Sequence, residues 1–151
     1  RIGGNKPLRC TVNPDLIGGE AYKKQKVNKP CNVVVVGAGT AGLEAACTAA
    51  EVGCKVTLLE KEKEAGGLSV EISKIPAKKR LADFPTYLKY RASKLPNLTI
   101  KTGVDATVAE IKKYNPDIVV NATGSVPLLP PIEGLHDNLG KKDASVYSIK
   151  I

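Results

Sequence analysis

The chain of 151 residues contains no methionine and no tryptophan, one histidine, five tyrosines and one phenylalanine. A surface that stacks nucleic-acid bases needs aromatic rings among its basic residues, and the few rings here do not alternate with the Lys and Arg clusters. We therefore expect no nucleic acid as a partner, although Lys and Arg outnumber Asp and Glu by 23 to 15. Because even the first residue is not methionine, we expect a processed product or a piece of a longer protein.

Long apolar runs are missing as well. A membrane-spanning helix needs about 20 consecutive apolar residues, and no such stretch occurs. The first ten residues carry three positive charges and no apolar segment, so they do not resemble a signal peptide. We expect no membrane as a partner.

The four cysteines lack the Cys-x-x-Cys spacing of zinc sites, and His136 is the single histidine that could join them. Their even number permits two disulfide bonds. However, Cys47 falls on the apolar face of an expected helix and Cys54 at its end, where small buried thiols are common. We favour a reduced, cytoplasmic protein. Cys10 lies in a basic, proline-containing segment, and its surroundings alone indicate an incidental free thiol.

The remaining composition is that of one ordinary globular domain, with 42% hydrophobic and 25% charged residues. The net charge of +8 is concentrated in residues 1–30 and 62–101, which each carry +5, whereas residues 31–61 and 102–151 each carry −1. We expect the two basic blocks to form solvated faces, or surfaces that meet acidic parts of a partner.

The hydrophobic pattern changes abruptly at Cys31. Residues 1–30 are punctuated by glycine and proline and keep no regular period, which predicts an extended arm. The next expected elements are a strand at 33–36 that is buried on both faces, a helix at about 40–52 ended by Gly53, and a strand at 55–60. Strand, helix and strand within about 30 residues predict a right-handed βαβ unit with parallel strands.

The pattern continues with a glycine-containing loop over about 61–77 and a helix over 79–95. The apolar side of that helix is expected at Leu81, Phe84, Leu88 and Leu95. Pro85 falls inside this span, so the helix can start as late as Pro85. Further strands are expected at 98–102 and 117–121 with a short helix near 106–113, and prolines interrupt regular structure after Gly124. The whole predicts an α/β fold with a central parallel sheet.

The segment Gly37-Ala-Gly-Thr-Ala-Gly42 joins the first strand to the helix, which is where a dinucleotide-binding loop stands. Gly37 permits a tight turn, Gly39 leaves the backbone open to a pyrophosphate, and Gly42 lets the helix pack close to the strand. The amides and dipole of the helix then attract the phosphates. Glu60, 18 residues after Gly42, is placed to accept hydrogen bonds from an adenosine ribose, which favours FAD or NAD(H) over NADP(H).

This loop alone leaves FAD and NAD open. Two later features are Gly66-Gly67 after the second strand and Ala122-Thr123-Gly124 after a later buried strand. The combination resembles the Rossmann-like FAD domain of the glutathione-reductase-like flavoproteins, in which the Ala-Thr-Gly turn packs near the flavin dinucleotide. The NAD domain of a simple dehydrogenase would more often continue with regular βα units.

Three stretches carry a closer resemblance. They are residues 6–14 (KPLRCTVNP), residues 36–46 (VGAGTAGLEAA), and residues 65–68 (AGGL) with 74–78 (KIPAK). Together they resemble the C-terminal region of the NADH:flavin oxidoreductases, a family that includes 2,4-dienoyl-CoA reductase, 2-enoate reductase and trimethylamine dehydrogenase. The resemblance covers nearly the whole chain.

In that family an N-terminal (β/α)8 barrel binds FMN, a cysteine cluster holds [4Fe–4S], and FAD- and pyridine-nucleotide-binding modules follow. The resemblance implies that Cys10 matches the fourth cluster ligand, that residues 1–30 are an arm after the cluster site, and that residues 31–151 are a partial FAD-binding domain. The barrel and the pyridine-nucleotide domain of the same parent chain would then be its partners. That parent would relay electrons from NAD(P)H through FAD to an iron–sulfur and FMN half and reduce an activated C=C bond.

By the same resemblance, FAD contacts are expected at Gly37, Gly39, Ala41 and Gly42 for the pyrophosphate and at Glu60 for the ribose. The further expected site positions are Thr40, Lys61, Gly67, Leu68, Lys78, Ala106, Ala122, Thr123 and Gly124. No catalytic residue is expected in this part of the family, so the chain by itself would be inactive. Two alternatives are an NAD-binding domain of a simple dehydrogenase and a non-catalytic basic interaction module.

Overall fold

The computed structural model describes residues 24–126 and 128–143, so Cys10 and most of the expected arm lie outside the described residues. The strands are β1 (Asn32–Val36), β2 (Lys55–Leu59), β3 (Leu98–Lys101) and β4 (Ile118–Asn121). The helices are α2 (Thr40–Glu51), α3 (Leu68–Ser73), the 3-10 helix η2 (Pro76–Ala82), α4 (Asp83–Ser93), α5 (Val108–Lys112) and α6 (Leu135–Asn138).

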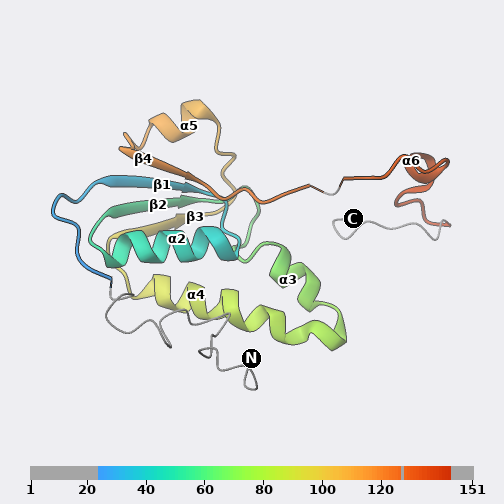
Figure 1. Ribbon diagram of the computed structural model, residues 1–151, viewed down its shortest axis with the longest axis horizontal. Helices are drawn as coiled ribbons and strands as arrows, with labels where there is room; N and C mark the ends of the chain where they lie inside the picture. Colours follow the sequence, from blue (N-terminus) through green and yellow to red (C-terminus); the bar gives the residue numbers. More distant parts are fainter. Residues whose placement is uncertain (1–23, 127, 144–151) are drawn as a thin grey trace, which may run out of the picture.

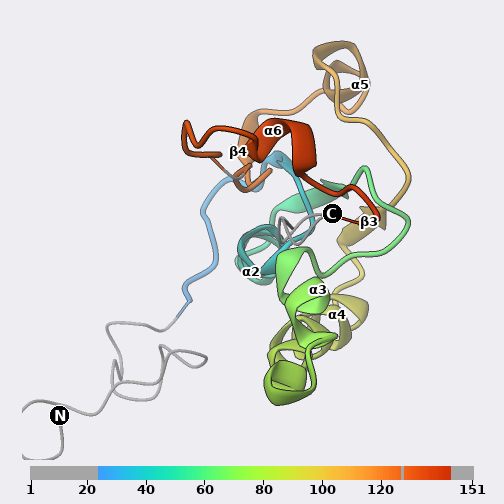
Figure 2. The ribbon, with the colours of Figure 1, turned by 90° about the vertical axis from the view of Figure 1, so that its right-hand side faces the viewer.

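The four strands form one parallel sheet in the order β3-β2-β1-β4. Viewed along the strands, α5 lies on one side of the sheet and α2, α3 and α4 lie on the other (Figure 2). Figure 1 shows all four strands ending at the same edge, where the β1–α2 connection and the chain after β4 also lie. The parallel α/β fold predicted from the sequence is confirmed.

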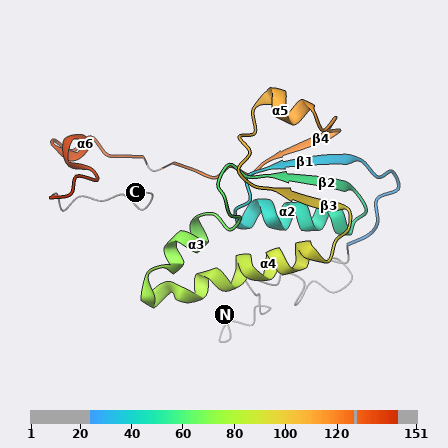
Figure 3. The ribbon, with the colours of Figure 1, turned by 180° about the vertical axis from the view of Figure 1, so that it is seen from behind.

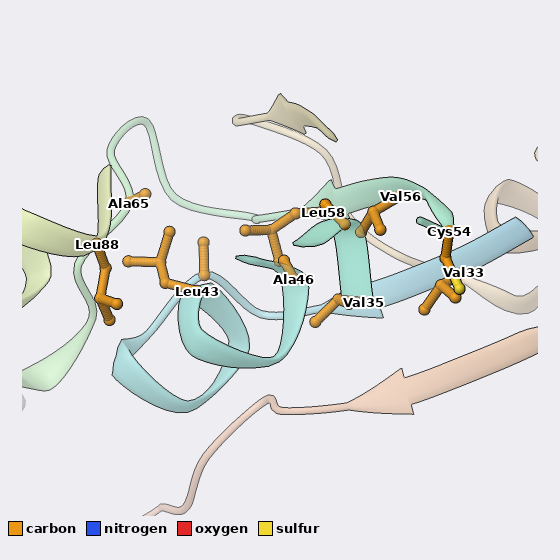
Figure 4. Close-up of a cluster of buried hydrophobic side chains, with 11 residues drawn as sticks. Val33, Val35, Leu43, Ala46, Cys54, Val56, Leu58, Ala65 and Leu88 are labelled. Carbon is orange, nitrogen blue, oxygen red and sulfur yellow. The ribbon is translucent and has the colours of Figure 1, made fainter. Parts of the chain in front are cut away.

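The core fills the space between the sheet and α2. Val35 of β1 and Leu58 of β2 lie near Leu43 and the small Ala46 of α2, and Val33 lies beside Cys54 at the other end of the cluster (Figure 4). Small residues on α2 let the helix lie close to the strands. The expected apolar face of this helix, which also includes Cys47 and Ala50, is buried as predicted.

The segment between β2 and β3 departs from the sequence prediction. Residues 61–77 were expected as a loop, yet they contain α3, which is too short to show a helical period and packs against η2. The expected helix over 79–95 divides into η2 and α4, and Leu81 is 45% exposed and therefore not on the apolar side. A 3-10 helix has three residues per turn, so Leu81 does not fall on the face that carries the buried Leu88. Pro85 stands in the first turn of α4, where its missing N–H leaves no helical bond unmade.

The two ends of the described chain leave the sheet in different ways. Residues 24–30 run along the end of α2, where the amide of Val27 donates to the carbonyl of Val52 at 2.9 Å. The expected domain boundary between residues 30 and 31 stays a prediction. After Gly124 the chain extends away from the sheet to α6, which stands apart from the other elements (Figure 3). None of the helices in the described part of the chain has the length and apolarity to cross a bilayer.

Candidate dinucleotide-binding site

The loop between β1 and α2 presents an uncapped helix end. The N-cap residue Gly39 is extended, with φ −70° and ψ −176°, and no side chain accepts a hydrogen bond from the first turn. The first turn also carries no acidic side chain. The free amides and the positive end of the dipole of this 12-residue helix therefore face outward at the carboxyl edge of the sheet, which suits an anion.

The three glycines of the loop have different steric surroundings. A Cβ at Gly37, where φ is +96°, would lie 2.5 Å from the carbonyl oxygen of Ala122. A Cβ at Gly42 would lie 1.8 Å from the carbonyl oxygen of Gly37, whereas one at Gly39 would meet no atom within 4 Å. The steric roles expected of Gly37 and Gly42 agree with these distances, and Gly39 opens the backbone to solvent.

The two other motifs noted in the sequence pack directly on this loop. The amide of Gly66 donates to the carbonyl of Ala38 at 2.8 Å. A Cβ at Gly67 would lie 2.8 Å from the Cα of Gly39, so the second glycine pair touches the first loop. The Ala122-Thr123-Gly124 turn joins them, because the amide of Ala122 donates to the carbonyl of Val36 at 2.8 Å. Parallel pairing thus brings together three glycine-containing turns that are far apart in the sequence.

Glu60 lies at the same edge with its side chain turned toward the loop. It is only 7% exposed. One carboxylate oxygen accepts from the amide of Ala38 at 2.6 Å, and the other accepts from the amide of Glu62 at 3.0 Å. The sequence reasoning missed the Ala38 contact. The adjacency of β1 and β2 was the signal that could have shown it, since it places the end of β2 beside the turn. Each oxygen keeps a second lone pair for a further donor.

The remaining expected site residues divide into two groups. Ala106 follows Val104, whose amide donates to the carbonyl of Glu60 at 2.8 Å, so the chain around Ala106 reaches the same edge. Lys61, Leu68, Thr123 and Gly124 are exposed, whereas Thr40 and Ala122 are half-buried. Lys78 is exposed in η2. Because η2 packs against α3 and α4, Lys78 lies apart from the residues around the glycine loop. Cys10 lies outside the described residues, so its expected role stays a prediction.

Comparisons with known proteins give consistent matches. Residues 32–83 match the family model of the FAD-dependent oxidoreductases. The chain is 39% identical over 136 residues to an NADH oxidase of Thermoanaerobacter brockii, covering 89% of this chain and 21% of that protein. It is 38% identical over 136 residues to a cinnamate reductase of Clostridium sporogenes, covering 89% of this chain and 20% of that protein.

Solved structures agree with these relatives. The chain resembles a 2-naphthoyl-CoA reductase in complex with 2-naphthoyl-CoA, with a TM-score of 0.78 and 35% identity over 87% of this chain and 20% of that one. It also resembles a histamine dehydrogenase from Rhizobium sp. 4-9, with a TM-score of 0.75 and 27% identity over 82% of this chain and 20% of that one. The chain therefore spans about a fifth of the length of the relatives that it matches.

Proposed function

We propose that this chain, which belongs to the NADH:flavin oxidoreductase family as part of its FAD-binding region, holds the FAD pyrophosphate at the loop of Gly37, Gly39 and Gly42. The observation that carries the proposal is the open space over Gly39 beside the uncapped start of α2. The amides of Thr40, Ala41 and Gly42 then stand where phosphate oxygens need donors. When bound, FAD exchanges electrons singly or in pairs, which suits it to a relay.

Glu60 supplies the second contact of the proposed site. Its carboxylate already accepts a hydrogen bond from the amide of Ala38, so the acid is joined directly to the loop. The free lone pairs accept from the ribose hydroxyls of the adenosine half. A 2′-phosphate at this place would meet the negative charge of Glu60, so FAD is preferred to NADP(H).

Two groups of residues surround this centre in the proposal. The inner group is Gly67, whose backbone touches Gly39, and the turn of Ala122, Thr123 and Gly124, which packs on the glycine loop. In the proposal these residues form the floor of the dinucleotide site. The outer positions are Lys61, Leu68, Lys78 and Ala106. Of these, Lys78 stands in η2, which packs against α3 and α4.

For the whole protein, we propose a multidomain cytoplasmic flavoenzyme that passes electrons from NAD(P)H through FAD to an iron–sulfur and FMN half. The similarity to proteins named NADH oxidase, cinnamate reductase and 2-naphthoyl-CoA reductase supports this assignment and a C=C bond as the reduced group. A barrel domain and a pyridine-nucleotide domain of the parent chain are the proposed partners. Residues 1–30 form the arm after the cluster site, with Cys10 as one thiolate ligand.

FAD titration of wild type and Gly39→Ala tests the site. The added methyl meets no protein atom, so we expect unchanged unfolding in urea. It occupies the space proposed for the pyrophosphate, so FAD affinity, followed by flavin fluorescence, should fall roughly tenfold, about 1.4 kcal/mol. Glu64→Ala, at an exposed acid in the loop after β2, is the control and should leave affinity unchanged. Binding of NADH without binding of FAD would overturn the proposal in favour of an NAD domain.

The role of Cys10 is tested in the full-length parent protein. Cys10→Ala should lower the iron content per chain, because a four-iron cluster that loses one thiolate ligand is less stable. Iron content equal to that of the wild type would show that Cys10 is a free thiol and not a cluster ligand.

A further inference from the structure

Two thiols lie side by side at the amino edge of the sheet, opposite the glycine loop. Cys31 immediately precedes β1 and Cys54 immediately precedes β2. Their Sγ atoms are 3.5 Å apart. Cys54 is buried and Cys31 is half-buried, so a small solute reaches the pair from the side of Cys31. Figure 4 shows Cys54 beside Val33, at the end of the core farthest from Leu88.

The backbone holds both cysteines in place. The amide of Lys55 donates to the carbonyl of Cys31 at 3.0 Å, continuing the parallel ladder in which Asn32 pairs with Lys55. The amide of Cys54 donates to the carbonyl of Ala49 at 3.0 Å, and the side-chain amide of Asn97 donates to the carbonyl of Cys54 at 2.7 Å. A disulfide has an S–S length of about 2.05 Å, so the sulfur atoms need to approach by only about 1.5 Å. Rotation of the two side chains supplies this movement without a break in the sheet.

We propose that Cys31 and Cys54 form a reversible disulfide bond when the chain meets a peroxide. The thiolate of Cys31 attacks one peroxide oxygen, which gives a sulfenic acid and releases one water. The thiol of Cys54 then attacks the sulfur of Cys31, the S–S bond forms, and the second water leaves. Two thiols lose two electrons and two protons, and hydrogen peroxide is reduced to two waters.

The order of these steps follows from the surroundings of the two thiols. Cys31 is the more exposed and therefore the first to react, and the buried Cys54 resolves the intermediate. The hydrogen bond to Cys54, with burial as the next cause, raises the pKa of the Cys31 thiol, so the thiolate is scarce at neutral pH and the first step is slow. Cys47 is buried within α2, and its Sγ lies near the carbonyl of Leu88 at 3.7 Å, so it stays out of the exchange.

The bond would close a loop that contains β1, the glycine loop and the whole of α2. Such a cross-link restricts the unfolded chain, so the oxidised protein should unfold at a higher urea concentration, by roughly 1 M. Because the pair lies at the edge opposite Gly39, FAD affinity should be equal before and after oxidation. The inference is therefore independent of the proposed function.

Peptide mapping of the full chain tests the proposal. The chain is treated with hydrogen peroxide, its remaining thiols are blocked with N-ethylmaleimide, and it is cleaved after glutamate. Cleavage after Glu20, Glu44, Glu51 and Glu60 places each of the four cysteines in a separate peptide. We expect residues 21–44 joined to residues 52–60, and separation of the two peptides on reduction.

Two variants define the outcomes further. Cys54→Ser should lose the joined peptide and leave Cys31 as a sulfenic acid that dimedone traps, whereas Cys47→Ala should retain the joined peptide. Blocked thiols at both Cys31 and Cys54 of the wild type after peroxide treatment would overturn the proposal. A bond from either one to Cys10 or Cys47 would overturn it equally.

Discussion

Gly39 and Gly42 lie three residues apart and lack a side chain for different reasons. At Gly39 the space is open to solvent, and at Gly42 it is filled by the carbonyl of Gly37. The missing side chain of Gly39 leaves room for a ligand, and the missing side chain of Gly42 lets α2 pack close to Gly37. The two effects can therefore be measured separately, because each alanine substitution should change one property.

We predict that Gly42→Ala destabilises the folded chain by at least about 2 kcal/mol, because its Cβ would overlap backbone that has no side-chain freedom to yield. Urea unfolding followed by circular dichroism measures this loss, with Gly39→Ala as the matched control at wild-type stability. Equal stability of Gly42→Ala and the wild type would mean that α2 does not approach Gly37 as closely as 1.8 Å implies.

The steric roles of the loop glycines were predictable from the sequence, and their packing partners were not. The spacing of Gly37 and Gly42 after a β-branched strand is sufficient to indicate a tight turn and a close helix. The approach of Gly67 to Gly39 and the bond from Ala38 to Glu60 depend on how distant turns meet. Such contacts arise from the parallel pairing of the strands, which no local pattern encodes.

At the scale of elements, the structure corrects the sequence prediction between β2 and β3. Period 3.6 identifies α2 because its buried residues repeat over three turns. The six residues of α3 are too few for a repeat, and in α3 and η2 no residue is buried. These short helices are held by tertiary contacts, since α3 packs against η2 and η2 packs against α4, and periodicity cannot show such contacts.

An ion cluster joins α2 to α4 and was not predicted from the sequence. Arg91 of α4 donates to both carboxylate oxygens of Glu51 and, at 2.7 Å, to Glu44. Lys24 also pairs with Glu51 at 2.6 Å. Glu51 stands at the negative end of the α2 dipole, where an acid is unfavourable unless cations compensate it. Hydrogen bonding from Arg91, the largest cause, lowers the pKa of Glu51 to about 2.

This cluster predicts how stability depends on pH. The pKa of Glu51 is lower in the folded chain than its ordinary 4.5, so its stabilising contribution is present above about pH 5 and is lost as pH falls toward 2. We expect Glu51→Gln to cost about 1–2 kcal/mol at pH 7, after allowance for solvent screening, and less at pH 3. Urea unfolding of both proteins at the two pH values measures the difference.

A matched substitution separates this effect from a general loss of charge. Glu71 forms an exposed pair with Lys74 three residues away, so Glu71→Gln should change stability by less than about 0.5 kcal/mol at either pH. A gap between wild type and Glu51→Gln that stays constant from pH 7 to pH 3 would show that Glu51 does not titrate as the cluster implies.

At the scale of the whole molecule, the sheet has two unlike edges. In the described part of the chain β3 and β4 are the outer strands. Thr99 of β3 and Val119 of β4 occupy the same cross-strand row, through Thr57 and Val34, and so share a face of the sheet. Thr99 makes the β3 edge polar, whereas Val119 is 48% exposed and makes the β4 edge apolar.

The basic block of residues 62–101 and the apolar β4 edge are two surfaces through which this chain could contact other domains or chains. The block of residues 62–101 includes η2 and α4, and these two helices carry the exposed cations Lys78, Lys79, Arg80 and Lys89. The helix α4 lies on the side of the sheet away from α5 (Figure 2). The expected role of this block as an interface with other domains stays a prediction. The apolar edge could not be predicted from the sequence, because the run at 117–121 is typical of a central strand and its place at the border follows from the strand order alone.

Unpaired apolar edge strands favour pairing between chains, so we expect concentration-dependent self-association of this chain through β4. Val119→Lys places a charge on that strand and should shift the sedimentation profile toward a monomer. Thr99→Lys places the same charge in the same row at the opposite edge and should leave the profile of the wild type unchanged. FAD affinity should be equal in all three proteins, since neither residue lies at the glycine loop. Two results would show that chains do not associate through β4. One is a wild-type chain that stays monomeric at every concentration, and the other is a Thr99→Lys variant that dissociates as readily as Val119→Lys.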